Sequence, residues 1–270
     1  MIIRDTGKVY KFDENDCIIA HHNKLETDPK WEEAIKDLLN RYDKTNIHSI
    51  YIRGSVATDW PVDGVSDLDI LLVFNIKTHI EDIFPSYTKF MAEHFKYHQY
   101  MVKTYPFIKG VDFSRPIDAQ RIGVVHRFLI KHLSVCIYGK NLQSKIPKFK
   151  KDEILNLDIR YKDLERGLDD IENGVDKMRS FCRGLIRVGF SLVNQTINTD
   201  IWTRDLFQCQ KYFSEAYPER RKEIERIFEI ACLDNSTEKE RELVIGFSYW
   251  LKDELLKNNL ELNPKHEYNE

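Results

Sequence analysis

Two short polar motifs in the first half of the chain combine residue types that could carry chemistry. The first is Gly54-Ser55, which directly follows the β-branched run Ile47–Arg53. The second is the carboxylate pair Asp67 and Asp69, which is separated from Ser55 by eleven residues and opens another apolar run. Two carboxylates one residue apart repel each other unless a cation lies between them. Their oxygens are hard ligands of the kind that Mg²⁺ prefers, so the pair predicts a magnesium site.

The residues beside the two aspartates predict a site for phosphate groups. Gly54 lets the backbone approach a phosphate closely, while Ser55 offers a hydroxyl and neighbouring amide groups. Ser66, directly before the first aspartate, is a further nucleotide-binding candidate. Each motif alone is common in surface turns, but their combination with two apolar runs is rare and indicates function.

Two strands must hold these side chains in place. We expect one strand at Ile47–Arg53 and another at Asp67–Phe74, in which successive side chains alternate between the two faces. The two aspartates then share one face of their strand. Leu68 and Ile70 lie on the other face and point into a core.

The pattern of elements changes near Lys145–Lys151 and predicts two domains. Before this point, further strands at Phe107–Phe113 and Ser134–Tyr138 alternate with helical segments, which favours a mixed sheet. After it, nearly every segment has helical periodicity, which favours an antiparallel helical bundle. We therefore expect an α+β chain with a sheet domain over residues 1–147 and a helical domain over residues 148–270. The helices should cover Lys151–Asn173, Asp176–Val193, Thr203–Tyr217, Pro218–Cys232 and Thr237–Asn258, with a capping box formed by Ser236 or Thr237 and Glu240.

Composition and charge argue against several protein classes. The 41 basic and 44 acidic side chains give a formal net charge of −3, which argues against a protein that coats long nucleic acid. No apolar run approaches the roughly 20 residues that span a bilayer, and no signal peptide precedes the first charges. The five cysteines are odd in number, widely spaced and without a C-x-x-C pair, which favours free thiols in the cytoplasm.

The segment around the two motifs resembles the signature of the polymerase-β-like nucleotidyltransferase superfamily, in which an apolar strand, Gly-Ser and a loop precede an apolar-flanked Asp-x-Asp. The resemblance implies a third carboxylate between apolar residues on a later, adjacent strand. Asp112 stands between Val111 and Phe113 and is the candidate. Asp118 is the fallback, although its place before a helical pattern is typical of an N-cap.

Residues 132–142 resemble the last strand of the bacterial aminoglycoside adenylyltransferases, especially the streptomycin/spectinomycin type. The helical half resembles theirs in layout, with a helix that carries Arg183 and Arg187 and a last helix that carries Lys252. This resemblance makes Lys252 a candidate for nucleotide binding. Those enzymes often have a basic residue in the turn after the Arg-bearing helix, where this chain has Asn194-Gln195-Thr196.

The resemblance also implies a reaction, in which a nucleoside monophosphate (AMP from ATP) passes to a hydroxyl group of a small molecule such as an aminoglycoside antibiotic. Asp67 and Asp69 would hold Mg²⁺, with two ions in all, and Ser55 would contact the terminal phosphates. Asp112 would complete the metal site or deprotonate the acceptor. An acidic acceptor site could come from the second domain, although a solvated helix face explains its acidic residues better: Asp169, Asp170, Glu172 and Asp176.

Other functions stay open at this point. The same fold could serve a regulatory or antitoxin-type enzyme that adenylylates a protein, or a nucleotide-binding sensor without catalysis. The intact aspartate pair argues against the sensor, and nothing in the sequence separates a drug acceptor from a protein acceptor. Arg121 with His126 and Arg127 with His132 also match a loose ribonuclease pattern, but such short matches often arise by chance.

Overall fold

The computed structural model divides the chain into two compact units, each of which is described by itself. The sheet unit is formed by Ala20–Pro147, and the helical unit by Met1–Ile19 together with Lys148–Glu270. The sheet unit ends at Pro147, and the N-terminal segment is grouped with the helical unit. The residues that the structure describes are 9–19, 29–41, 44, 47–58, 66–74, 99–101, 103–105, 107–108, 111–114, 124–155, 161–174, 177–197, 199–233 and 237–258.

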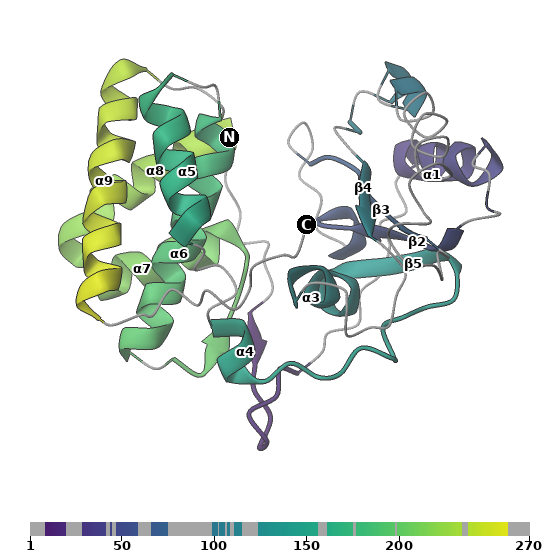
Figure 1. Cartoon of the computed structure of the whole chain (residues 1–270), viewed down its shortest axis with the longest axis horizontal. Helices are drawn as coiled ribbons and strands as arrows, with labels where there is room; N and C mark the ends of the chain where they lie inside the picture. The colour runs from purple at the N-terminus through teal and green to yellow at the C-terminus, as the bar shows by residue number, and fades with distance from the viewer. Residues whose placement is uncertain are drawn as a thin grey trace, which may run out of the picture. The chain divides into compact units, whose positions relative to one another are not determined.

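The sheet unit is built on a four-stranded mixed sheet with the strand order β4-β3-β2-β5 (Figure 1). β2 (Ile47–Arg53) and β3 (Asp69–Phe74) are antiparallel neighbours, and β5 (Ser134–Gly139) pairs antiparallel with the other edge of β2. β4 (Val111–Ser114) runs parallel to β3 and forms the opposite edge of the sheet. Helices and strands thus share the unit, which gives the chain a mixed α/β architecture.

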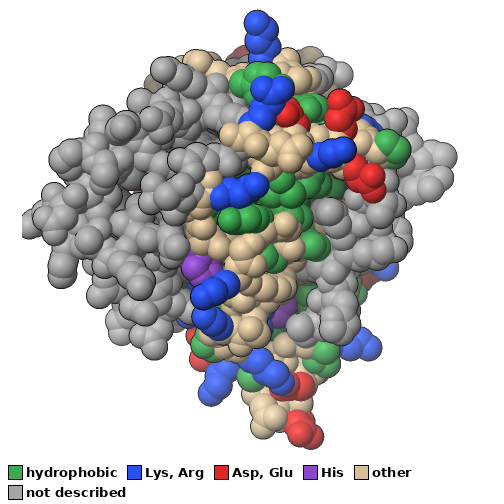
Figure 2. Space-filling model, turned by 90° about the vertical axis from the view of Figure 1, so that its right-hand side faces the viewer, with side chains coloured by type: hydrophobic (Ala, Val, Ile, Leu, Met, Phe, Trp, Pro, Cys, Tyr) green, Lys and Arg blue, Asp and Glu red, His purple; other side chains and the backbone are tan. Residues whose placement is uncertain are grey.

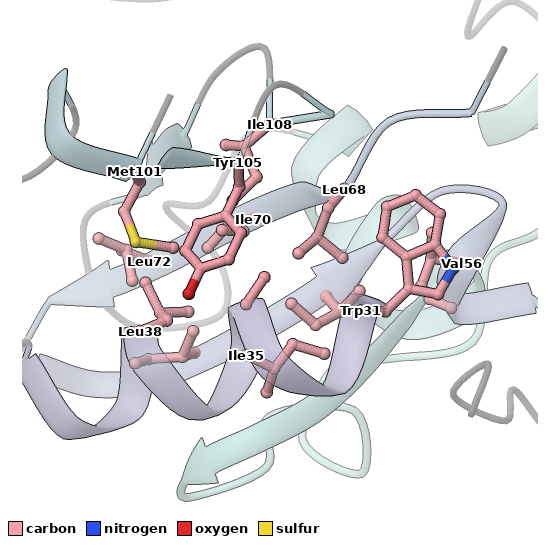
Figure 3. Close-up of a cluster of buried hydrophobic side chains, with 14 of the residues drawn as sticks. Trp31, Ile35, Leu38, Val56, Leu68, Ile70, Leu72, Met101, Tyr105 and Ile108 are labelled. Atoms are coloured by element: carbon pink, nitrogen blue, oxygen red, sulfur yellow. The ribbon is translucent and has the colours of Figure 1, made fainter. Parts of the chain in front are cut away.

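The main core of this unit lies between one face of the sheet and α1 (Pro29–Arg41), whose apolar residues recur at helical spacing. Figure 3 shows Trp31 and Leu38 of the helix facing Leu68, Ile70 and other strand residues across this core. Burial of each large side chain stabilises the fold by about 1.5–3 kcal/mol. Phe107 packs edge-on against Trp31 in the same core, at a centroid distance of 4.7 Å. Phe107 lies before β4, which begins at Val111, so our expected strand at Phe107–Phe113 began too early.

Another helix, α3 (Val124–Leu133), packs against β2 and β5. Its Phe128 stacks on His132 at a centroid distance of 4.7 Å, and both side chains are fully buried. A histidine with 0% exposure cannot reach an RNA substrate, so Arg127 and His132 do not form a ribonuclease site. The second pair of that pattern, Arg121 and His126, lies outside the described side chains.

The helical unit is organised around α6 (Met178–Ile197). This helix packs against α5 (Tyr161–Glu172), α7 (Leu206–Ala216), α8 (Arg221–Leu233) and α9 (Glu238–Lys257). Its apolar side chains are buried along almost the whole helix. The capping box at the start of α9 is confirmed, because the Glu240 amide donates to Thr237 Oγ1 and the Thr237 amide donates to the Glu240 carboxylate. A short helix, α4 (Lys151–Leu155), precedes these helices in the chain.

The N-terminal segment is tied to the helical unit by backbone pairing. β1 (Tyr10–Lys11) pairs antiparallel with β6 (Ile201–Trp202), and Ile18 donates its amide hydrogen to the carbonyl of Phe149 at 2.9 Å. Tyr10 is buried beside the Trp202 ring, and this burial raises the pKa of the tyrosine. Strands of two residues are too short to leave a periodic pattern, which is why the sequence did not assign this segment to the helical unit.

The described surface mixes charged and apolar side chains. On the face that Figure 2 shows, Lys and Arg side chains spread along the described part, and acidic and apolar side chains lie among them. Among the described residues, no helix is both long enough and apolar enough to cross a membrane.

Candidate functional site

The Gly54-Ser55 turn lies where β2 ends, as the sequence predicted. Gly54 has a φ of +75°, a left-handed conformation that costs a residue with a side chain about 1–2 kcal/mol. Its amide hydrogen is donated to the carbonyl of Leu133 at 3.1 Å, which ties the turn to the end of α3. The carbonyl of Gly54 accepts from the amide of Ala57 at 3.1 Å, inside the short 3₁₀ turn Val56–Thr58. The turn is therefore fixed at both ends by main-chain hydrogen bonds.

The two aspartates lie at the entrance of β3, on either side of a buried leucine. Leu68 and Ile70 are 1% and 0% exposed, whereas Asp67 and Asp69 are partly exposed. This confirms the predicted alternation, although the strand itself begins at Asp69 and not at Asp67. The amide of Leu68 donates to the carbonyl of Phe107 at 2.9 Å, so the chain is already held one residue before the strand.

The two motifs, which are far apart in the sequence, meet in the structure. Ser55 Oγ donates a hydrogen bond to Ser66 Oγ at 2.9 Å, and this contact brings the Gly-Ser turn beside the residue that precedes Asp67. The carboxylate of Asp69 lies directly over Gly54, because a Cβ placed on that glycine would be only 2.6 Å from Asp69 Oδ2. A side chain at this position would therefore displace the Asp69 carboxylate, in addition to adopting an unfavourable φ. Gly54, Ser55, Ser66 and Asp69, together with Asp67, which directly follows Ser66, form one site, which we call the Gly-Ser/Asp site.

Sequence reasoning missed one member of this site, Arg53. Arg53 and Asp69 are directly paired residues of β2 and β3, and side chains in such positions share one face of the sheet. Arg53 Nη2 lies 3.9 Å from Asp69 Oδ1, with the arginine side chain 16% exposed and the aspartate side chain 42% exposed. The signal was the charge of the residue before the glycine, but only the strand register shows that it faces an aspartate.

The third candidate carboxylate, Asp112, lies on β4, beside β3. In the parallel register residue 112 pairs with residue 71, two residues beyond Asp69. Because residues two apart share a face, the backbone places positions 69 and 112 on the same face of the sheet. The alternative candidate, Asp118, lies outside the described residues.

The donor atoms of the Gly-Ser/Asp site suit a magnesium ion. Carboxylate oxygens of Asp67 and Asp69 and hydroxyl oxygens of two serines are hard ligands, and Mg²⁺ usually takes one or two carboxylates and completes its shell with water and phosphate oxygens. Within the described side chains, which do not include that of Asp112, no group of three His, Cys, Asp or Glu residues could hold a metal ion. A two-carboxylate site that is completed by substrate phosphates fits this arrangement.

The candidate residues of the helical unit are engaged in side-chain contacts within that unit. Lys252 Nζ of α9 lies 2.7 Å from Glu165 Oε1 of α5, with the two side chains 25% and 44% exposed. Asp170 forms an ion pair with Lys177 at 2.8 Å, and Asp169 accepts a hydrogen bond from Asn173. These contacts are those of a solvated helix face. Glu172 accepts from the hydroxyl of Tyr249 at 2.8 Å, and Asp176 lies outside the described residues.

The arginines of α6 lie beside main-chain carbonyl groups. Arg183 Nε donates to the carbonyl of Ala231, near the end of α8, and Arg187 Nε donates to the carbonyl of Arg204, each at 3.4 Å. We expected Asn194-Gln195-Thr196 in the turn after this helix, and that expectation was wrong because α6 continues to Ile197. The basic residue that follows α6 is therefore Arg204, which lies between β6 and α7.

Comparisons with known proteins agree with this geometry at the level of fold. No protein-family model matches the sequence, and no curated protein matches it either. Among solved structures, the chain is similar to the spectinomycin adenyltransferase AAD(9) from Enterococcus faecialis, whose crystal structure contains ATP and spectinomycin. The two share 13% sequence identity with a TM-score of 0.52, over 83% of this chain and 98% of the other. The chain thus shares its overall fold, at this distance, with that solved structure.

Proposed function

We propose that the protein is a Mg²⁺-dependent nucleotidyltransferase, which transfers AMP from ATP to a hydroxyl group of a small molecule. The observation that carries the proposal is the Gly-Ser/Asp site, where the glycine turn lies against the carboxylate of Asp69 and the Ser55 hydroxyl donates a hydrogen bond to Ser66. Two neighbouring carboxylates reduce stability by repulsion unless a cation offsets their charge. A role in holding a metal–phosphate complex gives a reason for their placement.

Each residue of the site has a part in this reaction. Asp67 and Asp69 would hold Mg²⁺, which when bound would neutralise phosphate oxygens and support an in-line displacement at phosphorus. Ser55 turns its hydroxyl from Ser66 to the terminal phosphates, and Gly54 leaves room for them. Asp112 accepts the proton of the acceptor hydroxyl while the hydroxyl oxygen forms a bond to the α-phosphorus of ATP. Pyrophosphate leaves with the electron pair of the broken bond.

The acceptor in this proposal is an aminoglycoside or aminocyclitol antibiotic. The solved structure that shares this fold is a spectinomycin adenyltransferase that holds ATP and spectinomycin. Spectinomycin, streptomycin and related antibiotics therefore form the first panel of acceptors, and purified protein is incubated with each in the presence of ATP labelled at the α-phosphate. Labelled antibiotic and free pyrophosphate are the expected products. Label on the protein itself or on a protein partner would redirect the proposal to a regulatory adenylyltransferase.

The metal-binding residues provide the decisive test. Asp67→Asn and Asp69→Asn should each lower the transfer rate at least about 100-fold, because metal stabilisation of transition-state charge contributes several kcal/mol. Glu32→Gln is the matched control, since Glu32 is an exposed acid of α1 in the same unit. Circular dichroism establishes that each variant is folded. Full activity in either aspartate variant would contradict the proposed metal site.

A further inference from the structure

The arginine that precedes the Gly-Ser turn contacts a carboxylate that the proposed reaction needs for metal. Arg53 lies opposite Asp69 in the antiparallel register of β2 and β3, with Nη2 3.9 Å from Oδ1. The other carboxylate oxygen, Oδ2, lies over Gly54. The carboxylate is thus held between a guanidinium group on one side and a side-chain-free backbone on the other.

This arrangement has an electrostatic consequence for any divalent cation that approaches Asp69. A guanidinium group stays charged at every pH at which the protein is folded, so its charge offsets that of the carboxylate permanently. It also repels a second cation that comes within a few ångströms. At 16% exposure the arginine is screened by solvent much less than a surface charge.

We propose that Arg53 is a positioning residue. While no metal is bound, it holds the carboxylate of Asp69 in position, and it lowers the affinity of the site for a divalent cation that arrives without nucleotide. The inference rests on the proposed function, because it assumes that Asp69 is a metal ligand. A bound triphosphate offsets the repulsion between Arg53 and the cation, since its negative charges attract both the cation and the guanidinium group. The metal then binds mainly together with the nucleotide, and Asp69 is already oriented when it arrives.

An alternative explanation is that Arg53 only stabilises the pairing of β2 with β3. That role predicts a change in thermal stability and no change in metal affinity. The two roles are separated by Mn²⁺ titration of the apo protein, in which electron paramagnetic resonance measures the free ion. The titration is repeated in the presence of inorganic tripolyphosphate, which supplies phosphate charge without a base or sugar.

We expect Arg53→Gln to bind Mn²⁺ alone at least about fivefold more tightly than the wild type, the factor that corresponds to one unit-charge repulsion at 4 Å in water. With tripolyphosphate the difference should disappear or change sign. Arg53→Met removes the charge but keeps the apolar stem, and it must behave as Arg53→Gln does. Arg53→Lys keeps the charge and should resemble the wild type. Arg41→Gln, which removes an exposed arginine of α1, is the control for net charge.

Three outcomes decide the matter. Tighter binding of Mn²⁺ by both uncharged variants, lost again when Asp69→Asn is added, supports the inference. Equal or weaker binding by these variants, with Mn²⁺ still bound at Asp69, overturns the inference and leaves the proposed function standing. Absence of Mn²⁺ binding in every variant, with and without tripolyphosphate, overturns the metal site and thereby both proposals.

Discussion

The sheet unit and the helical unit use their polar side chains in opposite ways. In the helical unit, polar groups of unlike character connect neighbouring helices, as Lys252 does with Glu165 and Arg183 with the carbonyl of Ala231. In the sheet unit, the Gly-Ser/Asp site brings two acidic residues together at the entrance of β3. Contacts of the first kind are explained by packing and capping, because each opposes unlike charges or satisfies a carbonyl group.

The placement of two carboxylates together in the sheet unit is not explained by stability. Two carboxylates on one face at the entrance of a strand make the folded chain less stable than neutral residues would, unless a positive charge offsets their repulsion. Arg53 offsets part of this repulsion at Asp69. The comparison teaches that the sheet unit loses stability by holding two negative charges together, and this loss marks the site.

The largest expected effect comes from two matched glycines, one in each unit. Gly54 and Gly174 have φ values of +75° and +77°, so alanine pays the same conformational cost of about 1–2 kcal/mol at either position. The surroundings differ. A Cβ on Gly54 would lie 2.6 Å from Asp69 Oδ2, whereas on Gly174 the nearest atom is Arg241 Nη1 at 3.8 Å.

Gly54→Ala should therefore lower the transfer rate at least about 100-fold by displacing the Asp69 carboxylate, because an ångström of misplacement can cost that much. Gly174→Ala should lose similar stability and keep its activity. Thermal unfolding and initial rates of labelled-AMP transfer measure the two effects separately. If both variants lost activity equally, the effect would be one of stability, and the distinction between the units would fail.

A second prediction concerns the strength of the sheet unit at high pH. Tyr51 of β2 is fully buried, and its hydroxyl oxygen accepts a hydrogen bond from the amide of Leu142 at 2.7 Å. Burial raises the pKa of Tyr51 to about 12, from an ordinary value of 10.0. The folded protein therefore keeps a proton that the unfolded chain loses. Its stabilising effect is complete below pH 10 and is lost as the pH rises towards 12, by about 2 kcal/mol.

Tyr51→Phe removes both the titrating group and the partner of the Leu142 amide. At pH 8 the variant should be less stable than the wild type by about 1–2 kcal/mol, the cost of an unpaired buried amide. Between pH 10 and 12 this difference should shrink, because only the wild type loses the contribution of the tyrosine. Urea titrations at several pH values measure the free energy of unfolding. A difference that grew with pH would refute the assignment.

The local parts of the fold followed from the sequence, and the pairings between distant segments did not. β2 begins and ends at the predicted residues because its β-branched run stops at glycine. The end of α6 was placed too early because Asn194, Gln195 and Thr196 resemble a turn. In the structure Asn194 is 1% exposed and accepts a hydrogen bond from the Thr199 hydroxyl, so burial prolongs the helix against local preference.

The site shows the same division. Gly54, Ser55 and Asp69 could be named from their spacing alone, since the Gly-Ser turn and the aspartate pair must lie close together to form one site. Arg53 could not be named, because its partner depends on which residue of β3 lies opposite, and a loop of eleven residues leaves that register open. Lys252 was chosen from the layout of a resembling family rather than from a local motif, and nothing in the sequence indicated its contact with Glu165.

The smallest expected effect tests whether Lys252 contributes to nucleotide binding. Its ion pair with Glu165 is exposed on the carboxylate side, and such pairs contribute at most about 1 kcal/mol to stability. Lys252→Met and Glu165→Gln both break the pair, but only the first removes the cation. If Lys252 binds phosphate, as the resemblance to the adenylyltransferases implies, Lys252→Met should weaken ATP binding about threefold to tenfold in calorimetry, the loss of one exposed charge contact. Glu165→Gln should leave ATP affinity unchanged or slightly higher, because it frees the lysine. Equal behaviour of the two variants would assign Lys252 to helix packing, and the comparison between the units would then become complete.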